Sequence, residues 1–173
     1  MRHPCKPSGL AFLPLIVALV TITGCQPPDP AAELKPITDA YVEAWNSGNL
    51  DGLDAIMDPQ FERRVSPASG TGAIGIDALK EVIAAFRTQF PDFRVVLDEE
   101  IFAADRAIAR WTFTGTNTGP GDFPPTGRAV TLSGTSIIHL SEGRMVTEWV
   151  QSDNLHLFQQ LGFTLSPPEG ETE

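Results

Sequence analysis

The chain has 173 residues, of which 42% are hydrophobic and 20% are charged, as is typical of one globular domain and not of a disordered chain. Its formal net charge is −10 and it contains no basic run, which argues against nucleic acid as a partner. The two cysteines, Cys5 and Cys25, lie near the N-terminus, so a disulfide or a cysteine-based zinc site inside the domain is excluded. Because His139 and His156 have no metal-binding spacing, we expect neither a metal nor another cofactor.

The first 24 residues have the organisation of a signal peptide. Basic residues precede an apolar run over residues 10–20, which is too short to span a bilayer comfortably. The sequence Ile22-Thr23-Gly24-Cys25 resembles a bacterial lipobox, in which the cysteine becomes the acylated first residue. We therefore predict a lipid anchor at Cys25 in the bacterial cell envelope, in the outer membrane if the cell is Gram-negative, and a proline-rich tether over residues 25–33. An ordinary secretory signal with a coincidental cysteine is the alternative.

Three apolar patterns with helical spacing follow. Hydrophobic residues three and four positions apart define each pattern, and Gly48, Pro59 and Pro91 end them in turn. A Ser- and Gly-rich stretch over residues 61–75 predicts one short strand followed by a loop. The predicted helices span residues 34–47, 50–57 and 75–89.

After Pro91 the hydrophobic pattern changes to a period of two, which predicts strands. A proline-rich loop over residues 119–127 interrupts them and is a candidate cover for a cavity. A short helix over residues 154–162 and a disordered acidic tail over residues 164–173 end the chain. Three helices followed by long strands indicate the α+β class, with strands expected over residues 93–102, 106–118, 128–140 and 145–152.

Several short motifs, taken in order, resemble a known family. The stretch Tyr41-Val42-Glu43-Ala44-Trp45-Asn46-Ser47-Gly48-Asn49-Leu50-Asp51-Gly52-Leu53 resembles the first helix and turn of the nuclear transport factor 2-like (NTF2-like) superfamily. The later motifs resemble its SnoaL-like polyketide or ester cyclase branch, and the resemblance covers residues 34–163. These motifs are Phe90-Pro91-Asp92, Arg110-Trp111-Thr112-Phe113-Thr114-Gly115-Thr116, Pro125-Thr126-Gly127-Arg128, Gly143-Arg144-Met145-Val146, Glu148-Trp149, Asp153 and Gln160-Leu161-Gly162.

The resemblance implies a cone in which a curved antiparallel sheet wraps around three N-terminal helices and encloses a pocket. It also implies a homodimer formed through the outer face of the sheet. The same cone serves as a cyclase, an isomerase, a hydrolase or a binding module, so the fold alone does not define the chemistry.

Asp153 matches the general acid/base aspartate of the cyclases. That residue takes a proton from a carbon beside a carbonyl and returns one to the new alkoxide. If the last strand is unbulged, alternation places Asp153 on the same face as Met145, Thr147, Trp149 and Gln151. The alternative is that Asp153 caps the helix that starts at Asn154.

Other residues are expected to line the pocket. Tyr41 stands where ketosteroid isomerases, a neighbouring branch, carry an oxyanion-hole tyrosine, although that branch's base aspartate has no counterpart here. Asn117 stands where many members have histidine. Arg63 or Arg64 could bind a carboxylate, although an arginine beside Glu62 is more often part of a surface ion pair. The residues predicted to contact a ligand are Tyr41, Trp45, Phe86, Trp111, Asn117, Trp149 and Gln151.

Two functions are compatible with the sequence. The first is a membrane-anchored SnoaL-like domain that binds a small apolar or carbonyl-containing molecule and acts on it through Asp153 without a cofactor. The second is a non-catalytic lipoprotein that uses the same pocket only for binding. Retention of aspartate at position 153 favours the first, and an envelope location favours the second.

Overall fold

The computed structural model describes residues 29–66, 72–164 and 166. The predicted signal peptide, Cys25 and most of the predicted acidic tail lie outside the described residues. In chain order the elements are α1 Pro30–Ser47, α2 Leu53–Ile56, β1 Met57–Val65, β2 Ala73–Ile74, α3 Ile76–Gln89, β3 Arg94–Ala103, β4 Arg106–Thr116, β5 Ala129–Ser141, β6 Arg144–Ser152 and α4 Asn154–Leu161.

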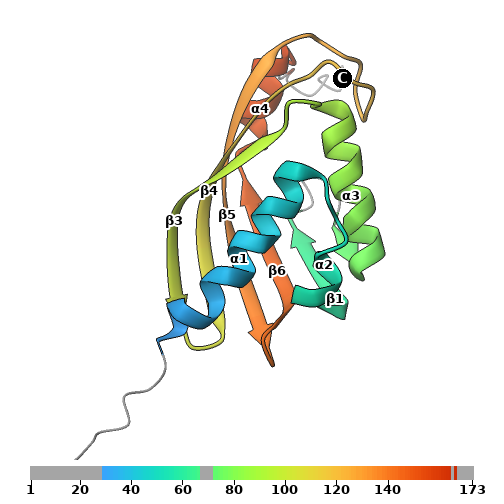
Figure 1. Ribbon diagram of the computed structural model, residues 1–173. Coiled ribbons are helices and arrows are strands. Elements are labelled where there is room, and N and C mark those ends of the chain that lie inside the picture. Colours follow the sequence, from blue (N-terminus) through green and yellow to red (C-terminus); the bar gives the residue numbers. More distant parts are fainter. Residues whose placement is uncertain (1–28, 67–71, 165, 167–173) are drawn as a thin grey trace, which may run out of the picture.

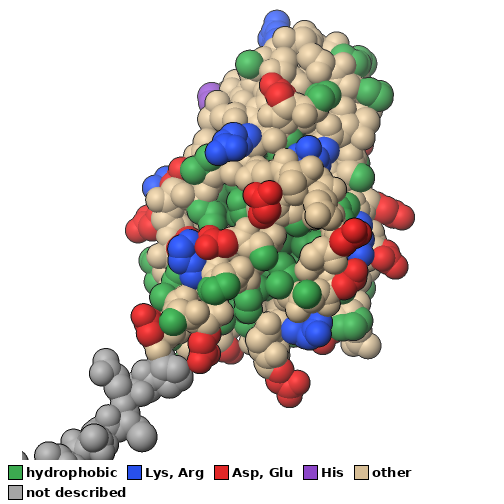
Figure 2. All heavy atoms as spheres, viewed as in Figure 1, with side chains coloured by type: hydrophobic (Ala, Val, Ile, Leu, Met, Phe, Trp, Pro, Cys, Tyr) green, Lys and Arg blue, Asp and Glu red, His purple; other side chains and the backbone are tan. Residues whose placement is uncertain are grey.

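The described strands form a six-stranded sheet in the order β2-β1-β6-β5-β4-β3. Figure 1 shows α1 lying across one face of the curved sheet, α3 beside it, and α4 at one end. From the same side, hydrophobic side chains reach the surface in the hollows between the helices (Figure 2). The predicted α+β architecture is confirmed, with one correction: β1 and β6 run parallel, whereas the other neighbouring strands are antiparallel.

Helix α1 begins earlier than the sequence predicted. The Asp29 side chain accepts a hydrogen bond from the backbone N–H of Ala31 at 3.0 Å, and Pro30 occupies the first turn, where its missing N–H has no cost. Gly48 ends the helix in a left-handed conformation. Residues 30–33 of the predicted tether are therefore helical.

The second predicted helix, over residues 50–57, is present but shorter than expected. Only four residues are helical in α2, and at Met57 the chain enters β1, which is longer than the short strand expected after Phe61. Met57 pairs with Met145 of β6, and both side chains are buried. Pairing with a distant strand therefore overrides a local pattern of helical spacing.

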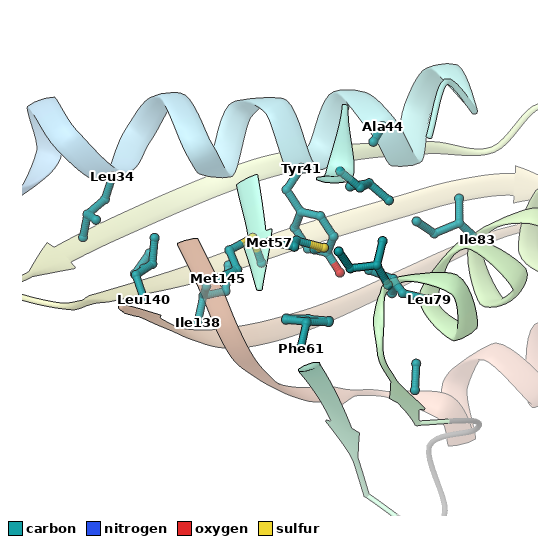
Figure 3. Close-up of a cluster of buried hydrophobic side chains, with 14 residues drawn as sticks. Leu34, Tyr41, Ala44, Met57, Phe61, Leu79, Ile83, Ile138, Leu140 and Met145 are labelled. Atoms are coloured by element: carbon teal, nitrogen blue, oxygen red, sulfur yellow. The ribbon is translucent and has the colours of Figure 1, made fainter. Parts of the chain in front are cut away.

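Two groups of buried side chains form the core. The first packs the helix faces of α1, α2 and α3 against the sheet, and Figure 3 shows Tyr41 reaching from α1 into this group, among Met57, Leu79 and Ile83. The second lies between the sheet and α4; its members are Phe90, Phe93, Phe113, Val130, Leu132, Leu157 and Leu161.

The outer face of the sheet carries a row of exposed hydrophobic side chains. Ile101 pairs with Ile108, Ile108 with Ile137, and Ile137 with Trp149, so the row crosses β3, β4, β5 and β6. Their side chains are 38% to 53% exposed. The Arg64 guanidinium, from β1, lies 5.0 Å from the Trp149 ring and extends the row.

Candidate functional site

A cavity of about 170 Å³ lies between the helices and the sheet. This volume is slightly larger than that of apolar cavities of ~150 Å³ that take up benzene. Its wall comes from α1, α3, five strands, the loop over residues 119–127 and α4. Aromatic side chains form much of this wall: Tyr41, Trp45, Phe86, Phe90, Phe93, Trp111, Phe113, Phe123 and Phe158.

The polar centre of this wall is the buried carboxylate of Glu148, on β6. One oxygen, Oε2, accepts a hydrogen bond from the Tyr41 hydroxyl at 2.8 Å, and the other, Oε1, accepts one from the Ser136 hydroxyl at 2.7 Å. The Ser136 oxygen in turn accepts the indole N–H of Trp111 at 3.1 Å. Side chains from α1 and β5 thus donate directly to the carboxylate of Glu148, a residue that is only 4% exposed, and a side chain from β4 supports one of the donors.

Arg63, on β1, completes the cluster. Its Nε lies 3.3 Å from Glu148 Oε2, and its guanidinium lies 5.7 Å from the centre of the Trp45 ring. A buried carboxylate needs such a cation and several donors, because it has lost its hydration. The parallel pairing of β1 with β6 places Arg63 directly beside Glu148 in the sheet.

The Tyr41 hydroxyl remains protonated in this environment. Burial raises the pKa of Tyr41 well above its usual value of 10.0, and the nearby negative charge of Glu148 raises it further. Tyr41 therefore acts as a neutral hydrogen-bond donor to Glu148 at neutral pH.

Four of the predicted ligand-contacting residues line the cavity, and three do not. Tyr41, Trp45, Phe86 and Trp111 belong to its wall. Asn117 is buried elsewhere, where its Oδ1 accepts the backbone N–H of Thr126 at 2.6 Å. Trp149 and Gln151 are exposed on the outer face of the sheet, so the predicted contact of these two residues with a pocket ligand is wrong.

A bulge in β6 explains the error. Leu140 pairs with Met145, but the preceding His139 pairs with Thr147, so Val146 is an extra residue. Simple alternation from Met145 would turn Trp149 inward, whereas the bulge turns Glu148 inward. One inserted residue thus exchanged the two faces of the strand beyond it.

Asp153 lies outside the cavity wall. Its side chain is exposed and accepts the backbone N–H of His156 at 3.1 Å, as the N-cap of α4. Asp153 therefore caps α4, which was the alternative considered from the sequence. The expected position of Asp153 on the pocket face is wrong.

The sequence also missed Glu148 and Ser136 as site residues. A glutamate in a strand is usually solvent-exposed, and only the bulge reveals that this one is inward. The sequence analysis considered two arginines, and the structure gives them different roles. Arg64 forms the ion pair with Glu62 that was considered for it, whereas Arg63 faces Glu148.

In residues 29–66 and 72–164 no group of three or more His, Cys, Asp or Glu is placed to hold a metal.

Comparisons with known proteins agree with this architecture. The family model described as SnoaL-like polyketide cyclase matches residues 35–161. A curved sheet packed against helices around a cavity defines the class of cone-shaped α+β domains. Within this class, the chain belongs to the SnoaL-like polyketide cyclase family. A search of curated proteins finds no match.

Several solved structures have the same fold as this chain. TsrD from Streptomyces laurentii is 26% identical, with a TM-score of 0.69, over 78% of this chain and 98% of that one. IdmH from Streptomyces antibioticus is 25% identical, with a TM-score of 0.65, over 75% and 98%. An NTF2-like protein of unknown function from Burkholderia pseudomallei is 20% identical and shares the fold, with a TM-score of 0.64 over 76% and 98%.

Proposed function

We propose that the cavity binds a small, mostly apolar carbonyl compound and that Glu148 moves a proton on it. The observation that carries the proposal is the buried carboxylate of Glu148, held by Tyr41, Ser136 and Arg63 inside an aromatic wall. Apolar pockets with a few convergent polar groups are typical ligand sites. This proposal transfers the acid/base role from Asp153 to Glu148.

The chemistry would be of the cyclase type. Glu148 takes a proton from a carbon beside the carbonyl, the resulting enolate carbon attacks a second carbonyl carbon of the same molecule, and the proton returns to the new alkoxide. Arg63 supplies the positive charge that favours the enolate. No external oxidant or reductant is needed, because the step only rearranges bonds within the substrate.

Glu148→Gln tests the proposal. The screen begins with activated methyl esters and β-keto compounds, and thermal shift reports binding. Once a turned-over compound is found, we expect Glu148→Gln to lower turnover by about 10² to 10⁴ while binding is kept. Glu148→Asp retains the charge beside Arg63 and separates lost catalysis from lost folding. Full activity in Glu148→Gln would remove the catalytic assignment.

Binding without turnover is the second candidate. It is favoured by the position of Asp153, since the aspartate that matches the family's acid/base residue lies outside the cavity wall. Stabilisation by compounds of the screen without any turnover would select this function.

We also propose that the domain is anchored to the bacterial envelope by a lipid on Cys25. The support is the lipobox-like sequence that ends at Cys25. No helix of the described residues is long and apolar enough to cross a membrane. Mass spectrometry of the protein from its own host should find an acylated Cys25, and Cys25→Ser should release the protein from the membrane fraction. Unchanged partition of that variant would contradict the anchor.

A further inference from the structure

Gln89, the last residue of α3, has an unusual side-chain amide. The residue lines the cavity and is only 7% exposed, yet its Nε2 has no hydrogen-bond partner among the described residues. An unpaired buried donor costs about 1–3 kcal/mol, and such groups are rare in native proteins. An amide nitrogen can only donate, so the missing partner is an acceptor.

Gln89 is in close contact with the loop over residues 119–127. The loop packs against the residue, with the backbone N–H of Gly119 donating to the backbone carbonyl of Gln89 at 3.1 Å. A Cβ added at Gly121 would lie 2.5 Å from Gln89 Cδ and 2.6 Å from Oε1. The carbon and oxygen of the amide are thus among the atoms nearest to this loop, whereas Nε2 is buried without a hydrogen-bond partner among the described residues.

Gln89 and Glu148 face the cavity from different parts of the core. Tyr41, the partner of Glu148, belongs to the group packed under α1, α2 and α3, whereas Phe90, next to Gln89, belongs to the group under α4. Trp45 packs against both groups, and its ring stacks on that of Phe93 at 5.6 Å between ring centres.

We infer that Gln89 is a ligand-binding residue whose amide N–H donates to an oxygen acceptor at the end of the ligand remote from Glu148. This inference rests on the proposed function and adds the substrate class: a flat, mostly apolar molecule with a carbonyl-type oxygen at each end. The acceptor is uncharged, because the cavity already contains the Glu148 carboxylate and the chain has a net charge of −10.

Three probes of nearly equal shape test the inference. These are 1,4-diacetylbenzene, with an acetyl group at each end, 4′-ethylacetophenone, with one, and 1,4-diethylbenzene, with none. For the wild-type protein we expect 1,4-diacetylbenzene to bind about tenfold more tightly than 4′-ethylacetophenone, measured by calorimetry. In Gln89→Met the two ketones should bind equally. Gln151→Met, the same change at an exposed site outside the cavity, should keep the wild-type difference.

The stability of the ligand-free protein gives a second readout. If Gln89 serves binding, Gln89→Met removes an unpaired buried amide and leaves the melting temperature unchanged or higher; if Gln89 serves only folding, the melting temperature falls. Equal affinity of both ketones for the wild-type protein would overturn the inference and leave the proposed function standing. Failure of all three probes to bind would overturn the proposed function, and the inference with it.

Discussion

Tyr41 is the only tyrosine of the chain, and its hydroxyl is buried against Glu148. Its pKa is raised in the folded protein, first by burial and then by the charge of Glu148, so the folded state holds the proton more tightly than the unfolded state does. The resulting contribution to stability is complete below a pH of about 10 and is lost as the pH rises above that value.

We therefore expect stability to fall more steeply in the wild-type protein than in Tyr41→Phe above pH ~10, by up to about 1.4 kcal/mol per pH unit. Urea denaturation across this range measures the difference. The pKa of Lys35 is also raised, chiefly by its hydrogen bond to Asp39, and both proteins share this contribution. Ultraviolet absorbance provides the direct check: tyrosinate should form only as the protein unfolds, and a titration near pH 10 in the folded state would contradict the assignment.

Asp153 allows a second prediction at the scale of the residue. As the N-cap of α4 it should tolerate Asp153→Asn almost without loss of stability, whereas Asp153→Ala should cost about 1 kcal/mol. Thermal denaturation of the two variants measures both effects. Loss of turnover in Asp153→Asn, with the fold intact, would return the acid/base role to Asp153.

The loop over residues 119–127 is the element most sensitive to a single methyl group. A Cβ at Gly119 would overlap the carbonyl oxygen of Thr88, at the end of α3, whereas a Cβ at Gly52 would meet nothing within 4 Å. Gly119→Ala should therefore destabilise the protein by about 1–3 kcal/mol or more and lift the loop from Gln89, while Gly52→Ala should be nearly neutral. Chemical denaturation tests this pair, and equal stability of the two variants would show that the loop is not packed on α3.

The sequence predicted some elements well and others poorly. The helix over residues 75–89 and the four long strands have strong periodicity, and their observed bounds differ from the predicted ones by at most two residues. The second helix is shorter than expected because β1 gains its pairing from β6, which no local pattern contains. The site was predicted in part. Four of the seven expected residues line the cavity, and all four are aromatic residues with the spacing of core positions. The inward position of the Glu148 carboxylate depends on one bulge in β6, which no local pattern shows.

At the scale of the whole molecule, the exposed row on the outer sheet face predicts self-association. Ile101, Ile108, Ile137 and Trp149 form a continuous apolar strip, which soluble monomers rarely expose. We expect a homodimer at micromolar concentration in sedimentation velocity and a monomer for Ile137→Glu. Ile74→Glu, on β2 and outside the row, is the matched control and should remain dimeric. A monomeric wild-type protein would contradict the prediction.

The parallel contact between β1 and β6 has a consequence for the order of folding. Arg64 pairs with Trp149, and the chain between them includes α3 and the strands β2, β3, β4 and β5. Closing so long a loop is slow, and proteins rich in such distant contacts fold slowly. The neighbours β3, β4 and β5 can pair as soon as they have been synthesised, and α1 can pack on β3 at that stage, but β1 lacks its long pairing until β6 has been made. The last strand synthesised thus decides when the first strand joins the sheet.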